Sequence, residues 1–188
     1  MGESKKLFAV SDVNGYLLPL KNALASAGFD ENDPSHIFVG CGNLFGDEAE
    51  NGDVFRFVAD LKHKVLIRGD RDETIAADMV DYFETSRYVF ISGWLPDERE
   101  GRVWRDASEE EWCAARRERW YRFYGRNDVI SDKILVCGNG PARLAYAFDL
   151  RALDDSSVYV GEGMIAIDAG TASSGRVNVL VSEEDERM

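Results

Sequence analysis

Four turns of this sequence carry the side chains best suited to chemistry, because each places Asp or Asn at a glycine-containing tip. The turns lie at residues 11–15, 42–46, 68–73 and 137–141. Their candidate metal ligands are Asp12, Asn14, Asn43, Asp70 and Asn139. Carboxylate and amide oxygens are the ligands that Mg²⁺ and Ca²⁺ accept, so these residue types are typical of a metal or phosphate pocket.

The elements that must position these turns follow a repeated order. Each turn comes after a short apolar run that predicts a buried strand. The runs are residues 7–10, 37–39, 65–67 and 134–136. The spacing of apolar side chains predicts helices over about 17–27, 53–61 and 73–83. This alternation predicts parallel strands, and ligands of open α/β sheets bind beyond the carboxyl ends of such strands, so we expect the four turns to meet in one crevice.

Later segments look different. Three further strands are predicted at 157–160, 164–167 and 177–181, close enough together to be antiparallel, and Gly161 and Gly163 indicate a hairpin turn between the first two.

Six turns in register resemble the motifs of the calcineurin-like metallophosphoesterases, especially their short bacterial serine/threonine-phosphatase and dinucleoside-polyphosphatase branch. That family reads Asp-x-His-Gly, Gly-Asp, Gly-Asn-His-Glu or Asp, His-Gly-Gly, Gly-His-Thr and a closing Asp-x-Gly. The corresponding positions are residues 12–15, 42–43, 69–72, 92–94, 138–140 and 167–170. The likeness spans about 7–181 and implies a single α/β domain over 1–188, a two-sheet sandwich flanked by helices with a helical insertion at about 97–132.

Most metal-binding side chains of that family are replaced here. Going by the resemblance, Asn14, Ser92 and Asn139 stand at histidine positions. Asn43 replaces a bridging aspartate and Asp70 an asparagine ligand, while Arg71 and Asp72 occupy degenerate catalytic positions. Asp12 alone is unchanged, and Asp47 and Glu48 stand where the family has a phosphate-clamping arginine.

Three functions follow from these replacements. The first is a catalytically inactive pseudo-phosphatase with no cofactor that acts in binding or protein interaction. The second is a protein or nucleotide phosphatase, hence a phosphoric ester hydrolase, with one weakly bound Mg²⁺, Mn²⁺ or Ca²⁺ on oxygen ligands. The third is a metal-free binder of a nucleotide or phosphopeptide through Arg68, Arg71 and Arg143, which Asp12, Asp47 and Asp72 would oppose.

Composition and net charge limit the kinds of binding partner and the compartment that we expect. The 188 residues carry a net charge of −13, which disfavours nucleic acid and anionic membrane surfaces. Three cysteines without paired metal-binding spacing indicate a reducing compartment, so we expect a cytoplasmic protein. Both histidines, His36 and His63, are expected away from the crevice.

The predicted insertion has an unusual composition. A capping box at Ser108 and Glu111 predicts a helix start. Arginines and aromatic side chains then follow at helical spacing to about residue 126. They are expected either to pack as a structural cap or to form a surface for a protein partner or self-association. The candidate interaction residues are Arg116, Arg119, Trp120, Arg122 and Tyr124.

Overall fold

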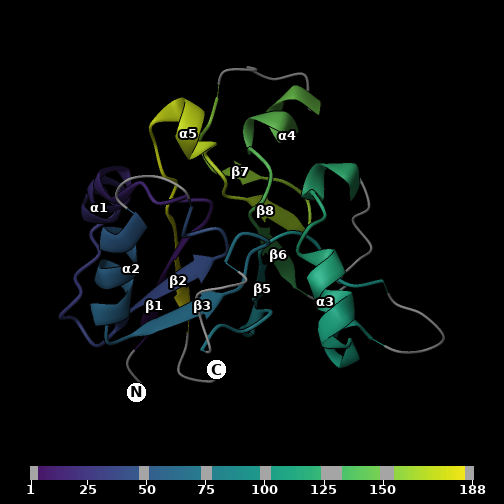
Figure 1. Ribbon diagram of the computed structural model, residues 1–188, viewed down its shortest axis with the longest axis horizontal. Coiled ribbons are helices and arrows are strands. Elements are labelled where there is room, and N and C mark those ends of the chain that lie inside the picture. Colours follow the sequence, from purple (N-terminus) through teal and green to yellow (C-terminus); the bar gives the residue numbers. More distant parts are fainter. Residues whose placement is uncertain are drawn as a thin grey trace.

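Two β-sheets form the centre of the computed structural model, which describes residues 4–46, 51–72, 78–97, 103–123, 133–148 and 155–184 (Figure 1). The first sheet has the order β3-β2-β1-β9. Its strands are β1 (Lys5–Val10), β2 (His36–Cys41), β3 (Lys64–Ile67) and β9 (Leu180–Glu184). The second sheet has the order β4-β5-β6-β8-β7. Its strands are β4 (Phe83–Glu84), β5 (Tyr88–Ile91), β6 (Ile134–Cys137), β7 (Tyr159–Val160) and β8 (Met164–Ala166).

Alternation along the strands distributes their side chains between two cores. In β1, Leu7 and Ala9 face the second sheet, where they pack in one cluster with residues such as Phe90 and Val136. The intervening Phe8 and Val10 belong to a different cluster, beneath the helices that cover the other face of the first sheet. Because both faces are covered, β1 reads as a continuous apolar run rather than as a half-polar strand.

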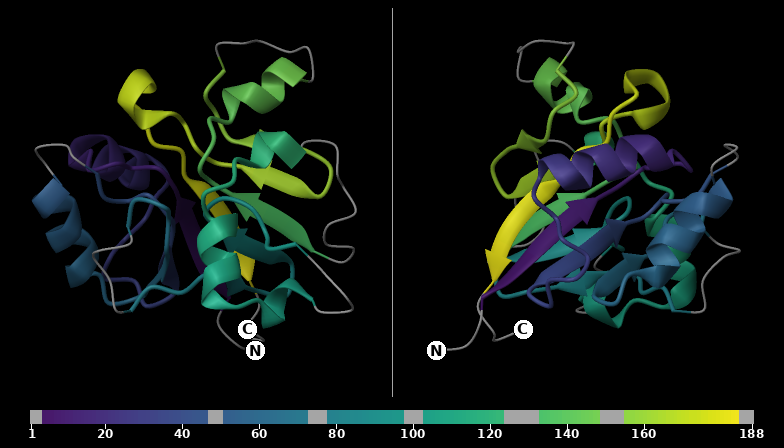
Figure 2. Two further views of the ribbon diagram at one scale, coloured as in Figure 1. Left: turned by 45° about the vertical axis from the view of Figure 1, so that its right-hand side comes forward. Right: turned by 90° about the vertical axis from the view of Figure 1, so that its left-hand side faces the viewer.

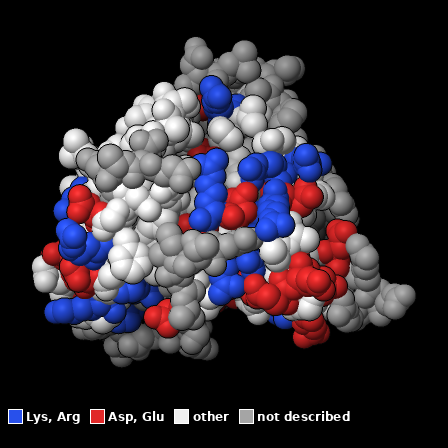
Figure 3. Space-filling model, viewed as in Figure 1, with Lys and Arg blue, Asp and Glu red and all other residues white. Residues whose placement is uncertain are grey.

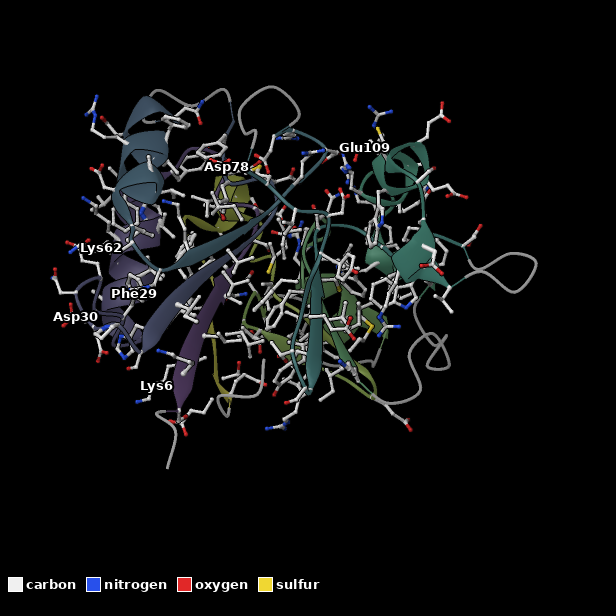
Figure 4. All side chains as sticks on the ribbon, turned by 90° about the horizontal axis from the view of Figure 1, so that it is seen from below. Lys6, Phe29, Asp30, Lys62, Asp78 and Glu109 are labelled. Atoms are coloured by element: carbon white, nitrogen blue, oxygen red, sulfur yellow. The ribbon has the colours of Figure 1, made fainter. Side chains whose placement is uncertain are left out.

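Helices α1 (Leu17–Ser26) and α2 (Asn51–Asp60) cover the outer face of the first sheet, as both views in Figure 2 show. Leu20 and Leu24 of α1 and Val54 and Val58 of α2 are buried against it, as their helical spacing predicts. Figure 4 shows Phe29 between α1 and these strands, where its ring meets that of Phe8 edge-on at 5.2 Å.

The second sheet is covered by α3 (Glu109–Ala115), which carries Glu109 at its start (Figure 4), and by α4 (Arg143–Phe148). Two short 3-10 helices, η1 (Trp104–Asp106) and η2 (Trp120–Phe123), flank α3, and α5 (Thr171–Ser174) follows β8. The predicted two-sheet sandwich flanked by helices is therefore confirmed. Among the described residues, no helix has the length and apolar character needed to cross a bilayer.

Three local predictions need correction. The helix at 73–83 is wrong from Asp78 onward, because Val80 bridges to Ile67 and β4 begins at Phe83, while residues 73–77 lie outside the described part. The last strand is antiparallel, but it leaves the β7-β8 hairpin and pairs with β1 of the first sheet. The single helix expected after the capping box ends at Ala115, and the chain turns before η2.

Candidate functional site

The turns after β1, β2, β3 and β6 open into one crevice of about 380 Å³. Five of the residues singled out in the strand-end turns line it: Asp12, Asn14, Asn43, Arg71 and Asn139. The parallel pairing of β1 with β2 and of β2 with β3 places three of these turns at the same edge of the first sheet. The β6 turn reaches the same place from the second sheet.

The backbone is held in an uncommon conformation around the crevice. Asp12, Asn14, Asn43 and Asn139 have φ angles of 51°, 51°, 52° and 54°, and in the described part of the chain they are the non-glycine residues with positive φ. Asn and Asp tolerate this left-handed region better than other side chains, and the strain costs about 1–3 kcal/mol at each position. Such strain persists only where neighbouring contacts fix the conformation, so the contacts of these four residues must hold the turns in place.

Three of these side chains form a closed hydrogen-bond network. The Asn43 amide Nδ2 donates to Asp12 Oδ1 at 3.1 Å and to Asn139 Oδ1 at 3.2 Å. The backbone N–H of Asn139 donates to Asp12 Oδ2 at 2.7 Å, and that of Arg71 donates to Asn43 Oδ1 at 3.1 Å. Asp12, Asn43 and Asn139 are at most 6% exposed, so this network holds three strand-end turns together in a nearly dry environment.

Asp168 is a site residue that the sequence reasoning treated only as part of a turn. It lines the crevice and accepts hydrogen bonds from the backbone N–H groups of Gly140, at 3.0 Å, and Gly170, at 2.6 Å. Burial, followed by the proximity of Asp168, raises the pKa of Asp12 well above its usual value, and burial also raises the pKa of Asp168. The sequence does indicate this role by position, because Asp168 follows an apolar run, as Asp12 does.

Asp72 does not serve the crevice, contrary to its expected place among the catalytic positions. Its buried carboxylate accepts backbone N–H groups from Asn43 at 2.6 Å, Gly69 at 3.0 Å and Phe45 at 3.3 Å. Burial raises the pKa of Asp72, although these hydrogen bonds act in the opposite direction. Asp72 therefore holds the turn after β2 and the turn after β3 together through these backbone hydrogen bonds.

Asp70 and Ser92 also lie outside the crevice lining. One carboxylate oxygen of Asp70 is 3.6 Å from Arg119 Nη1, and the other is buried without a hydrogen-bond partner. Ser92 is buried beneath Gly42, where an added Cβ would lie 2.3 Å from the serine Oγ. Gly42 also has a φ of +81°, so both its conformation and its surroundings require glycine.

These donors do not fit a metal centre. Both oxygens of Asp12 accept N–H groups, and the Asn43 side-chain oxygen accepts another, so a cation would have to displace the network. Arg71 adds a guanidinium group at the crevice, donating to Asn14 Oδ1 at 3.2 Å. Within the described residues, no group of three or more His, Cys, Asp or Glu side chains is arranged to hold a metal ion.

Two of the candidate interaction residues on the insertion, Arg116 and Trp120, are buried. Trp120 is fully buried and donates its indole N–H to the carbonyl of Gly140 at 2.6 Å. Arg116 is also buried, paired with Asp81 at 2.7 Å and with Glu109 at 3.1 Å. Exposed Arg122 pairs with Glu118 at 2.9 Å, Arg119 lines the crevice, and Tyr124 lies outside the described residues.

The insertion instead closes one side of the crevice. The Asn139 amide Nδ2 donates to the carbonyl of Arg116 at 2.8 Å, and Trp120 holds the next residue of the same turn. A Cβ at Gly93 would approach the carbonyls of Ala115, Arg116 and Glu118 to 2.6–2.8 Å, so the segment after α3 lies directly on the β5 turn. Asn139 thus binds the insertion to the network.

No protein-family model and no curated protein matches the sequence. Among solved structures, the chain is similar to a protein provisionally named a diadenosine tetraphosphatase, with a TM-score of 0.66, 13% identity, and coverage of 97% of this chain and 95% of that chain. It is also similar to a protein serine/threonine phosphatase from Saccharomyces cerevisiae, described as resembling human phosphatase PP5, with a TM-score of 0.56, 10% identity, and coverage of 96% and 80%.

At this level of identity the likenesses show the fold alone. The fold is that of the calcineurin-like metallophosphoesterases, as the six turns of the sequence predict. Proteins of this fold family normally bind divalent metal ions. At the ends of β1, β2 and β6, the described residues of this chain place a hydrogen-bonded network of amide and carboxylate side chains.

Proposed function

We propose that this protein is a catalytically inactive member of the phosphoesterase fold that acts by binding rather than by hydrolysis. The supporting observation is the network of Asp12, Asn43 and Asn139, which uses the oxygens that a metal would need. A dinuclear centre requires several anionic or imidazole donors to offset its charge. Here, an amide stands where a second carboxylate would bridge two ions, and its N–H groups point at Asp12 and Asn139.

The neighbouring groups support the same proposal. Burial raises the pKa of Asp12, which favours the neutral acid over the carboxylate that a cation needs. Cys41 and Cys137 are buried with raised pKa values, again chiefly through burial, so neither offers a thiolate. His36 is occupied away from the crevice, where its Nδ1 accepts the backbone N–H of Asp30 at 3.0 Å.

The direct test is cation binding measured by titration calorimetry on protein stripped with a chelator. We expect no saturable binding of Mn²⁺, Mg²⁺ or Ca²⁺ at millimolar concentration. The alternative function, a phosphatase with an oxygen-ligand metal site, requires saturable binding that is lost in Asp12→Ala. Asp12→Ala is the matched control, because Asp12 would be a ligand of any such site.

Activity provides an independent test. We expect p-nitrophenyl phosphate, its diester analogue and dinucleoside polyphosphates to be hydrolysed no faster than in buffer, with Mn²⁺, Ni²⁺ or Mg²⁺ added. Metal-dependent turnover that disappears in Asp12→Ala would contradict the proposal. We propose that the binding role is in the cytoplasm, since none of the described cysteines, Cys41, Cys113 and Cys137, forms a disulfide.

A further inference from the structure

Two guanidinium groups in the crevice lack full partners. Arg71 comes from the β3 turn and Arg119 from the segment before η2, and both line the crevice. The guanidinium group of Arg71 is exposed; it forms one hydrogen bond, to the uncharged Asn14, and no ion pair with any residue in the described ranges. Arg119 forms an ion pair with Asp70, whose Oδ2 lies 3.6 Å from Arg119 Nη1, but Nη1 is buried without a hydrogen bond. Figure 3 shows Lys and Arg side chains among Asp and Glu across the middle of the face that is seen in Figure 1.

The carboxylates that would oppose an anion have other partners. Asp72 is 1% exposed and clamps backbone N–H groups beneath the turns, outside the crevice lining. Asp12 accepts N–H groups at both oxygens, and Asp168 accepts one backbone N–H at each oxygen. These carboxylates already accept hydrogen bonds from the protein, whereas Arg119 Nη1 is buried without one. Asp47, the other acid named from the sequence, lies outside the described residues.

A third hydrogen-bond donor at the crevice comes from α5. Thr171 lines the crevice, is 1% exposed, and its hydroxyl has no hydrogen-bond partner. A buried hydroxyl without a partner costs about 1–3 kcal/mol, so a ligand oxygen there would relieve that cost. Tyr16, Tyr121 and Leu144 supply less polar wall, and about 380 Å³ is within the usual range for small-molecule pockets.

We propose that the crevice binds a phosphate monoester directly on Arg71 and Arg119, with Thr171 as a third donor and with no metal ion. Guanidinium groups from two separate segments and a hydroxyl from a third suit an oxyanion with three free oxygens. A carboxylate, with two oxygens in one plane, would satisfy one guanidinium fork alone. This inference rests on the proposed function, because it assigns the ligand of the same metal-free crevice. Arg68, expected from the sequence to take part, is instead paired with Glu109 at 2.9 Å.

The experiment is calorimetric titration of chelator-treated protein with phenyl phosphate, and with benzoate as the carboxylate analogue. We expect saturable binding of phenyl phosphate that is at least about tenfold tighter than binding of benzoate. Arg71→Gln and Arg119→Gln should each weaken phenyl phosphate binding by about tenfold or more, the loss expected for a charge-assisted hydrogen bond. Arg119→Lys, which retains the charge without the fork, should recover part of the affinity.

Arg122→Gln is the matched control, because Arg122 lies on the same segment as Arg119, is exposed and pairs with Glu118 outside the crevice. Its affinity should stay within about twofold of the wild type, and circular dichroism should confirm the fold of each variant. Orthophosphate, adenosine monophosphate and a phosphoserine peptide then identify what carries the phosphate. Saturable binding of any of them that depends on Arg71 and Arg119 supports the proposal.

The negative outcomes separate the two proposals. No saturable binding of any phosphate, with or without metal and without hydrolysis, would overturn the phosphate site and leave the inactive fold standing. Equal affinities for the wild type, Arg71→Gln and Arg119→Gln would do the same. Phosphate binding that requires Mn²⁺ and is lost in Asp12→Ala would overturn both.

Discussion

Asn43→Asp is the most informative single substitution, because it restores the bridging aspartate of the resembled family at the centre of the network. Asn43 is 2% exposed and its amide donates to Asp12 and Asn139. The substitution replaces both donations with a carboxylate facing two acceptors. Two lost hydrogen bonds contribute about 2 kcal/mol, and an uncompensated buried charge raises the total destabilisation to roughly 3–5 kcal/mol.

The measurement is urea unfolding at pH 7 in a chelator, with Asn43→Ala as the variant that removes the amide without adding charge. Asn43→Asp should be the less stable of the two. Its deficit should shrink as the pH falls, because the introduced carboxyl group becomes neutral when protonated and again donates a hydrogen bond. Mn²⁺ at 100 times its dissociation constant would restore about 2.7 kcal/mol if the new carboxylate creates a site. An Asn43→Asp protein as stable as the wild type in chelator would refute the idea that this network joins the turns.

Three further substitutions test other parts of the structure. Asp12→Asn should become more stable relative to the wild type as the pH rises from about 4. The raised pKa of Asp12 means that the folded wild type binds this proton more tightly than the unfolded chain, so the wild type loses stability as the proton leaves. Urea midpoints that differ by a constant amount across pH would contradict this. Trp120→Phe should destabilise the fold by about 1–3 kcal/mol by leaving the buried carbonyl of Gly140 unpaired, as thermal unfolding would show, and an unchanged midpoint would argue against the contact. Hydrogen bonds from Arg105, together with Lys133, lower the pKa of Glu84 to about 2. Glu84→Gln should therefore lower the free energy of unfolding by about 1–2 kcal/mol at pH 7, and this difference should disappear as the pH falls through about 2. The same loss of stability at both ends of that pH range would count against an ionic role.

The local features of the fold could be predicted because their causes lie within a few residues. The capping box is an example: the Ser108 hydroxyl accepts the N–H of Glu111, and the Glu111 side chain accepts the N–H of Ser108. Helix α1 and the parallel strands β1, β2 and β3 likewise follow from apolar spacing that neighbouring residues carry. The glycine turns mark the strand ends for the same reason.

The contacts of the aromatic side chains in the insertion could not be predicted from the neighbouring sequence. Trp112, Trp120 and Phe123 have helical spacing, yet the helix ends at Ala115, and Trp120 donates a hydrogen bond to Gly140 on a strand-end turn outside the insertion. Periodicity identifies residues that pack on something, but it does not identify what they pack on. The sequence therefore left open whether Trp120 packs inside the protein or contacts a partner, and the structure shows that it is buried.

The sequence determined the strand-end turns and the absence of histidines from them, and its family resemblance predicted the two-sheet fold. Only the tertiary structure decided what the replacing residues do. Asn43 reaches Asp12 across 31 residues of chain, and Asn139 reaches Asp12 across 127. An amide can donate or accept equally well, so its role depends on which groups the folded chain brings within about 3 Å. Here these groups are each other's partners. Within the described residues, this leaves Arg119 Nη1 buried without a hydrogen bond at the crevice, and the exposed guanidinium group of Arg71 with one hydrogen bond, to Asn14.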